Sequence, residues 1–186
     1  MIRYAAVLGS GLLGLSACGE RNDPAPAPPT EAAAPAAPAT EPAVDPRRLS
    51  AVGLGPARIG MSRADLVAAW GDDANPSAVG GANPEACDIF HPAKAPSGVS
   101  VMIQEGRLTR ITLMRDAVEK TDRGFGIGDA ALDVKQAYGG SLISQLHKYQ
   151  SAPAEDLFAW VKGGSTAYVT DPEARGVRYE IGSDGK

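Results

Sequence analysis

The stretches at residues 59–71 (IGMSRADLVAAWG) and 127–139 (IGDAALDVKQAYG) align without a gap, 68 positions apart. Five positions are identical, and an aromatic residue precedes the last glycine in both stretches: Trp70 in the first and Tyr138 in the second. Sequence repeats usually reflect duplicated supersecondary units. The pair therefore predicts a unit that occurs twice, with chance similarity between two alanine-rich helices as the alternative.

Each stretch is predicted to form a short helix with defined ends. Ser62 is a typical N-cap, and Asp65 three residues later completes a capping-box pattern. In the second stretch we expect Asp129 to be the N-cap. Gly71 and Gly139 are expected to end the two helices with positive φ angles, as glycines after a helix commonly do.

The apolar residues of both helices are expected to pack on a sheet. Leu66, Val67 and Trp70 have the spacing of one helix face, and Val134 and Tyr138 take the equivalent places in the second helix. A single apolar stripe must be buried against another element. The aromatic residue is therefore predicted to anchor each helix in the core.

After each helix the apolar pattern changes to the alternation of β-strands. In the first half this predicts a strand at 87–91 and a hairpin of 99–104 and 107–114, joined by the two-residue turn Glu105-Gly106. Val99, Val101, Ile103, Ile111 and Leu113 are expected on the buried face. In the second half, strands are predicted at 147–150, 157–161, 166–170 and 177–181. The fold class is therefore α+β, with two tandem units that each pack a short helix on an antiparallel meander. Two such units side by side are expected to share one core.

The N-terminal residues have the pattern of a secretory signal. Arg3 is followed by an apolar run at 5–15 and by the sequence Leu-Ser-Ala-Cys, which ends at Cys18. The run is far shorter than the roughly 20 apolar residues that cross a bilayer. Leu-Ser-Ala-Cys resembles the lipobox of bacterial lipoproteins, with an ordinary cleaved signal as the alternative. The resemblance implies cleavage before Cys18, diacylation of its sulfur and acylation of its new amine.

The rest of the chain divides into a spacer and a globular part. We expect a signal peptide at 1–17, lipidated Cys18 with a Pro/Ala-rich linker at 18–47, and a globular domain at 48–186 whose units span about 53–116 and 124–182. Such a linker cannot bury enough apolar surface to fold, so it is expected to act as a tether. In enteric-type bacteria an aspartate directly after the lipidated cysteine resembles an inner-membrane retention signal. Gly19 occupies that position here, so the expected location is the outer membrane, lipid-anchored on the periplasmic side.

The repeated unit also resembles known envelope proteins. The Ile-Gly-Met-Ser-x-x-Asp-Leu opening, the Trp-Gly stop and the Gly-Arg-Leu-Thr-Arg-Ile return are similar to the SmpA-like outer-membrane-assembly lipoproteins and to β-lactamase-inhibitor-protein-like domains. The assembly lipoproteins have one unit where this chain has two. The resemblance implies a helix packed on an antiparallel sheet, and a partner that is an envelope protein or peptidoglycan. Inhibition of a periplasmic enzyme is the alternative function.

Composition and motifs favour a binding protein over an enzyme. The net charge of −4 argues against a nucleic-acid partner. No nucleophile-elbow, phosphate-loop or His-Glu-x-x-His motif occurs, so we expect no cofactor and no metal. Cys87 is expected to be a buried, inert thiol; a Cys87-dependent enzyme or a zinc site with His91 and His147 is the alternative. Asp72-Asp73 are expected to be solvated, with calcium binding as the alternative.

Basic and aromatic residues supply the candidate binding surface. Arg107, Arg110 and Arg115 lie in or beside one predicted strand, and Arg178 lies in the matching late strand. They are either the solvated side of a sheet or a surface that binds carboxylates of peptidoglycan or of an acidic partner. An exposed aromatic loop at the cleft between the two halves would favour the inhibitor hypothesis, with Phe158 and Trp160 or Tyr149 as candidates.

Overall fold

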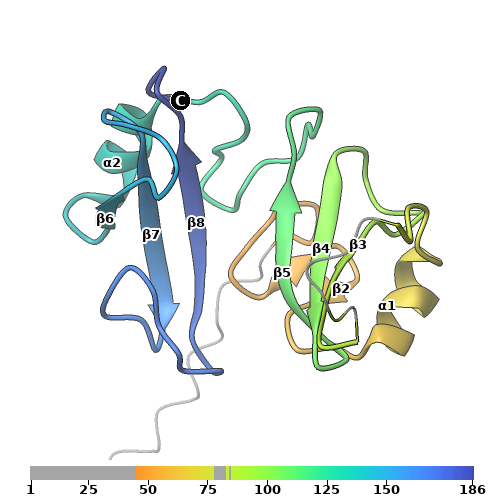
Figure 1. Ribbon diagram of the computed structural model, residues 1–186. Coiled ribbons are helices and arrows are strands. Elements are labelled where there is room, and N and C mark those ends of the chain that lie inside the picture. Colours follow the sequence, from red (N-terminus) through yellow and green to blue (C-terminus); the bar gives the residue numbers. More distant parts are fainter. Residues whose placement is uncertain (1–44, 78–82, 84) are drawn as a thin grey trace, which may run out of the picture. The chain divides into compact units, whose positions relative to one another are not determined.

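The computed structural model describes residues 45–77, 83 and 85–186 of the 186-residue chain. The predicted signal at 1–17, Cys18 and the linker up to residue 44 lie outside the described residues. The described residues all belong to one compact part of the chain. The α+β class is confirmed, because two short helices each precede a three-stranded antiparallel sheet (Figure 1).

Helix α1 (Arg63–Trp70) begins and ends where the sequence indicates. The Ser62 hydroxyl accepts the backbone N–H of Asp65 at 3.1 Å and donates to the Asp65 carboxylate at 2.6 Å. The two residues of the predicted capping box therefore bond to each other at the helix start. Gly71 ends the helix at a φ of 84°, a conformation that glycine adopts without strain.

Helix α2 (Ala131–Tyr138) has the same length, but its N-terminus is capped differently. The N-cap is Ala130, so the expectation that Asp129 caps this helix is wrong. The Asp129 carboxylate instead accepts the backbone N–H of Gly126 at 2.8 Å, within the turn that leads into the helix. The Gly185 carbonyl, from the end of the chain, accepts the N–H of Ala131 at 2.9 Å. Neither helix of the described part is long and apolar enough to cross a membrane.

The first sheet has the order β3-β4-β5 and contains the predicted hairpin. Its strands are β3 (Cys87–Phe90), β4 (Val99–Gln104) and β5 (Arg107–Leu113), preceded by a small ribbon of β1 (Gly53–Leu54) and β2 (Ala57–Arg58). Glu105 and Gly106 have φ angles of 49° and 74°. Two consecutive positive φ angles are typical of the type I′ turn that matches the twist of a hairpin.

A β-bulge shifts the pairing within this hairpin. Met102 pairs with Arg110, whereas Ile103 pairs with Leu108, so Thr109 is the extra residue of β5. The bulge interrupts the alternation of β5, because an extra residue changes which side chains face the core. As a result Leu108 lies on the same face as Ile111 and Leu113; Leu108 is fully buried, and the other two are partly buried against the same cluster.

The second sheet has the order β6-β7-β8, with strands β6 (Ile143–Leu146), β7 (Glu155–Lys162) and β8 (Arg175–Ile181). The predicted strands at 157–161 and 177–181 are confirmed, but those at 147–150 and 166–170 are wrong. The first strand after α2 is β6, which ends at Leu146, just before the predicted strand at 147–150. The segment at 163–174 turns back over Trp160, whose indole N–H donates to the Thr166 carbonyl at 2.8 Å.

The 68-residue offset of the repeat extends beyond the helices. It relates α1 to α2 and also β5 to β8, the third strand of each sheet. Arg110 of β5 thus corresponds to Arg178 of β8, and the buried Leu108 corresponds to Gly176. The helix and the third strand therefore recur at the same offset in both units, whereas the segments between the helix and the third strand differ.

Each helix packs on its own sheet, so the expectation of one shared core is wrong. Leu66 and Trp70 of α1 belong to a large cluster with the first sheet. Val134 of α2 forms a separate, smaller cluster with Leu157 and Ile181 of the second sheet. The large cluster consists of Leu54, Ala57, Leu66, Trp70, Phe90, Val99, Val101, Ile103 and Leu108. The helix-to-sheet packing was predicted correctly for each unit, but the two buried faces do not merge.

Thr121, in the connection between the units, joins segments that are distant in sequence. Its hydroxyl accepts the Phe125 N–H at 3.1 Å and the Tyr179 hydroxyl hydrogen at 3.3 Å. Tyr179 in turn lies 3.0 Å from the Tyr138 hydroxyl. Burial, followed by the hydrogen bond with Tyr179, raises the pKa of Tyr138 above its ordinary range, so the Tyr138 hydroxyl stays protonated and neutral.

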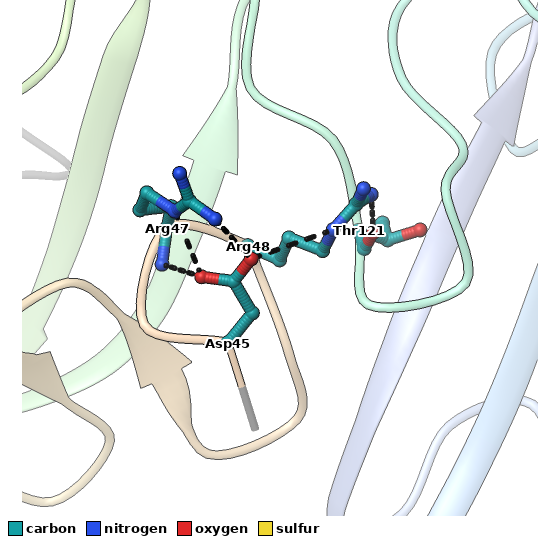
Figure 2. Close-up of polar contacts among 4 residues, drawn as sticks. All are labelled: Asp45, Arg47, Arg48 and Thr121. Carbon is teal, nitrogen blue, oxygen red and sulfur yellow. Dashed lines mark hydrogen bonds and ion pairs between the residues drawn. The ribbon is translucent and has the colours of Figure 1, made fainter. Parts of the chain in front are cut away.

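The start of the described chain is fastened to the same connection, as Figure 2 shows. The Arg48 guanidinium donates to the Thr121 carbonyl at 3.2 Å, and the Leu49 N–H donates to the Lys120 carbonyl at 2.9 Å. Asp45 accepts two hydrogen bonds from the Arg47 side chain, both at 3.1 Å, and these hold the pKa of Asp45 below its ordinary value. These bonds hold residues 48–49 against the segment that connects the two units.

Glu155 of β7 holds α2 on the second sheet and gives the fold a pH dependence. Its carboxylate accepts hydrogen bonds from Lys135 at 2.6 Å and Ser144 at 2.5 Å. Burial raises the pKa of Glu155, but these bonds and the Lys135 charge outweigh burial, and the pKa lies below its ordinary value. A carboxyl with a lowered folded-state pKa stabilises the fold above its unfolded pKa, and that stability is lost as the pH falls through the folded pKa.

We expect Glu155→Gln to lower the free energy of unfolding by about 1 kcal/mol near neutral pH. The difference from the wild type should shrink as the pH falls through the lowered folded-state pKa of Glu155, because the wild-type carboxyl then becomes protonated as well. Urea denaturation over a series of pH values from neutral to acidic measures this difference. A variant that is equally destabilised at neutral and acidic pH would contradict the role given to the Glu155 charge.

Candidate functional site

A cleft on the second sheet brings several aromatic residues together beside an arginine. Its volume is about 200 Å³. The walls come from β7, from β8 and from the segment between them. The lining residues are Phe158, Trp160, Ala167, Tyr168, Val169, Gly176, Val177 and Arg178.

The alternation of β7 places the cleft on one face of the sheet and α2 on the other. Leu157 is fully buried in the cluster with α2. Asp156, Phe158 and Trp160 point to the opposite face, because successive side chains of a strand alternate. Their partners on β8 include Arg178, which pairs with Phe158, and Gly176, which pairs with Trp160. We call this side of β7 and β8 the cleft face.

Three aromatic rings form the wall of the cleft. The Phe158 and Trp160 rings are nearly parallel, with an interplanar angle of 16° and centroids 6.1 Å apart. The Tyr168 ring meets Phe158 edge-on, at 73° and 5.2 Å. Phe158 is buried, whereas Tyr168 is 52% exposed. Gly164 lies directly against the Trp160 ring, a close approach that leaves no room for a side chain. The wall is therefore closely packed at Trp160 and accessible at its rim, which Tyr168 forms.

A buried acid holds the exposed rim in place. The Asp156 side chain is fully buried, lies 3.0 Å from an Arg178 nitrogen and accepts a hydrogen bond from the Tyr168 hydroxyl at 3.2 Å. Arg178 also pairs with Glu180 at 2.9 Å. Its guanidinium lies over the rings of Phe158 and Tyr168, 5.6 Å and 5.8 Å from their centroids. These contacts fix the positions of both rim side chains, Arg178 and Tyr168.

The polar side chains that line the cleft have partners within the described part of the chain. The Trp160 N–H donates to the Thr166 carbonyl, the Tyr168 hydroxyl donates to Asp156, and the Arg178 guanidinium is ion-paired with the carboxylates of Asp156 and Glu180. The two carboxylates outweigh the single guanidinium, so the charge of this group is negative. The cleft therefore offers an entering group apolar contact and a weakly acidic rim.

Comparison with known proteins does not assign a function to this cleft. The chain matches no family model, no curated protein and no solved structure. The resemblance of its repeat to the SmpA-like and β-lactamase-inhibitor-protein-like families stays a prediction. A function for this chain therefore has to be inferred from the chemistry of the cleft itself.

The predicted binding residues divide between the two sheets. Trp160 and Arg178 line the cleft together with Phe158. Arg107 and Arg110 lie on β5 of the first sheet, where Arg107 donates to the Gly60 carbonyl at 2.9 Å. Arg115 is an exposed residue just after that strand. The predicted set is thus not one cluster.

Other candidates from the sequence have different surroundings. Tyr149 is 80% exposed beside His147 and does not line the cleft. Asp156 and Tyr168 were not singled out by sequence reasoning, although an acid within the apolar run of β7 is an unusual feature that indicates a paired charge. Tyr168 reaches the cleft through the fold of a segment for which a strand was predicted.

The cysteine and histidine candidates are not brought into one site. Cys87 is a free thiol and only partly buried, so the expectation of full burial is wrong. The alternation of β3 points Asp88 and Phe90 inward instead, and Asp88 pairs with Arg63. Among the described residues, no group of three or more His, Cys, Asp or Glu side chains is arranged to hold a metal ion.

Asp73 has a structural role in the loop after α1. Its carboxylate accepts the backbone N–H groups of Asn75 at 2.9 Å and His91 at 3.1 Å. Asp72 beside it is exposed. These bonds tie the loop to the end of β3.

Proposed function

We propose that this chain is a lipid-anchored protein of the bacterial envelope that binds another protein through the aromatic cleft of its second sheet. The lipobox-like sequence ending at Cys18 supports the anchor and the outer-membrane location. The linker would let the folded part act at a distance from the membrane. The observation that carries the binding role is an accessible aromatic cleft whose polar side chains already contact other residues of the chain.

The chemistry of the cleft favours a protein partner over peptidoglycan. A saccharide needs partners for its hydroxyl groups, because buried polar groups without hydrogen bonds are costly. The polar side chains of the cleft already have partners. Tryptophan, tyrosine and arginine are the residues enriched where a few contacts supply most of a protein interface's binding energy. Trp160, Tyr168 and Arg178 supply this combination.

The size of the cleft indicates what part of a partner would enter. Sites for small molecules typically have volumes of about 300–1,000 Å³. The 200 Å³ here suits one apolar side chain of a partner protein. The proposed role is non-catalytic, since the fully buried acid of the cleft is already occupied by Arg178 and Tyr168. Inhibition of a periplasmic enzyme would be a special case of this role.

We expect Trp160→Ala to remove most of the binding, by at least tenfold, because loss of a central aromatic anchor typically costs 2 kcal/mol or more, that is roughly a factor of 30. The measurement is capture from a detergent-solubilised envelope extract by the immobilised full-length chain. Tyr168→Ala serves as a second variant, and Tyr149→Ala, an exposed aromatic outside the cleft, is the matched control.

Thermal unfolding of each variant separates lost binding from lost folding. A protein that the wild type and Tyr149→Ala enrich equally, and that both cleft variants fail to enrich, would support the proposal. Isolated peptidoglycan sacculi are tested in parallel. Co-sedimentation with sacculi, without any protein that depends on Trp160, would assign the cell wall as partner and overturn it.

A further inference from the structure

Strand β8, which forms one side of the cleft, is an unpaired edge of its sheet. It pairs with β7 alone. Within the described residues, no backbone group of Arg175–Ile181 has a hydrogen-bond partner outside the β7–β8 ladder. Such an edge presents a row of free N–H and C=O groups that another strand can pair with.

The first unit shows how this edge is covered elsewhere in the same molecule. There the segment before α1 bonds to β5, the equivalent strand: the Gly60 N–H donates to the Leu108 carbonyl at 2.7 Å, and the Leu108 N–H donates to the Met61 carbonyl at 2.9 Å. In the second unit the equivalent segment, 128–130, makes no backbone bond to β8 among the described residues. Ile127 is 51% exposed, whereas its counterpart Ile59 packs on the core.

The open edge and the cleft lie at the same end of β8. Gly176, Val177 and Arg178 are residues of this strand and also line the cleft. Gly176 stands at the position where β5 has the buried Leu108, and its missing side chain leaves the Trp160 ring in direct contact with the strand. A strand added to β8 would place every second side chain on the cleft face.

We propose that an extended segment of the partner protein pairs with the free edge of β8 and places one apolar side chain in the cleft. Backbone hydrogen bonds to the edge would supply affinity, and the cleft would select the side chain, as in other complexes formed by strand addition. This inference rests on the proposed function, because it specifies how the same cleft binds its protein.

Charge indicates a second feature of the segment. Glu180 follows Arg178 on the cleft face and is 61% exposed. It shares Arg178 with the buried Asp156, so the pair of carboxylates carries one uncompensated negative charge. We therefore assign to the segment a basic side chain on the same face as its apolar anchor.

The test uses short random peptides displayed on phage and selected against the full-length chain in detergent micelles. The expected consensus has one apolar residue and one basic residue on the same face of an extended peptide. A synthetic peptide with the selected sequence is then methylated at one backbone nitrogen at a time. Strand pairing is expected to make methylation reduce binding more than tenfold at every second position and little between them, because alternate N–H groups of a strand face the same neighbour.

Hydrogen exchange supplies the matching readout on the protein. The outward-facing amides of Arg175–Arg178 are expected to exchange slowly only when the peptide is bound, and those of β5 should not change. Peptide binding that depends on Trp160 without the alternating pattern would overturn strand pairing and leave the proposed function intact. No selected peptide, or protection of β8 by a second copy of the chain without any peptide, would overturn the inference.

Discussion

Replacing Cys18 with serine is expected to release the protein from the membrane almost completely. The serine oxygen cannot take part in the thioether linkage that bacterial lipoproteins form, so no acyl chain would be attached at residue 18. One acyl chain holds a protein only marginally, whereas two or more hold it stably. Membrane fractionation and labelling with a radioactive or clickable fatty acid measure the change.

Cys87→Ser is the matched control, because it removes the other cysteine of the chain. The Cys87 thiol lies in the folded part, on β3, and we expect its replacement to leave both membrane partition and fatty-acid labelling as in the wild type. Labelling that survives Cys18→Ser would place the lipid elsewhere. Membrane partition that survives without any label would replace the lipid with another form of attachment.

Arg178→Met is expected to lower the free energy of unfolding by roughly 2–4 kcal/mol. The variant leaves the fully buried Asp156 carboxylate without its cationic partner and removes the cation from the rings of Phe158 and Tyr168. Removing one member of a buried ion pair typically costs 3–5 kcal/mol, and the lower value here allows for an arginine that is one third exposed. Urea denaturation measures the loss.

The repeat supplies a control for this prediction. Arg110→Met changes the equivalent residue of β5, which is exposed and has no ion pair within the described residues, so the expected change is within about 0.5 kcal/mol. Adding Asp156→Asn to Arg178→Met removes the uncompensated charge, and we expect it to restore part of the lost stability. Equal losses for Arg110→Met and Arg178→Met would show that the buried pair contributes nothing particular.

Local signals in the sequence were sufficient for the helices and the first hairpin. Ser62 and Gly71 mark the ends of α1 by bonds and backbone angles that involve only near neighbours. Glu105-Gly106 sets the turn of the hairpin in the same way. The third strands β5 and β8 were also predicted, from Ile111 and Leu113 in β5 and from the alternation of Val177, Tyr179 and Ile181 in β8.

The predictions that were wrong concern features that depend on contacts between residues distant in the sequence. The Asp129 cap is replaced by a carbonyl from Gly185, which no local pattern indicates. The expected strand at 166–170 is instead folded over Trp160, and this contact brings Tyr168 to Asp156. The candidate site was therefore found only in part: Trp160, Phe158 and Arg178 were named from the sequence, but their arrangement around a buried acid required the structure.

Site-specific photocrosslinking in growing cells tests whether a partner protein binds at the aromatic cleft of the second sheet. A photoreactive amino acid is placed at Val169, which lines the cleft, or at the exposed Gln136 of α2 as a control. We expect a discrete crosslinked protein with the probe at 169, none at 136, and loss of that product when Trp160→Ala is added. No crosslinked protein at 169, or the same product at both positions, would contradict a partner bound through the cleft.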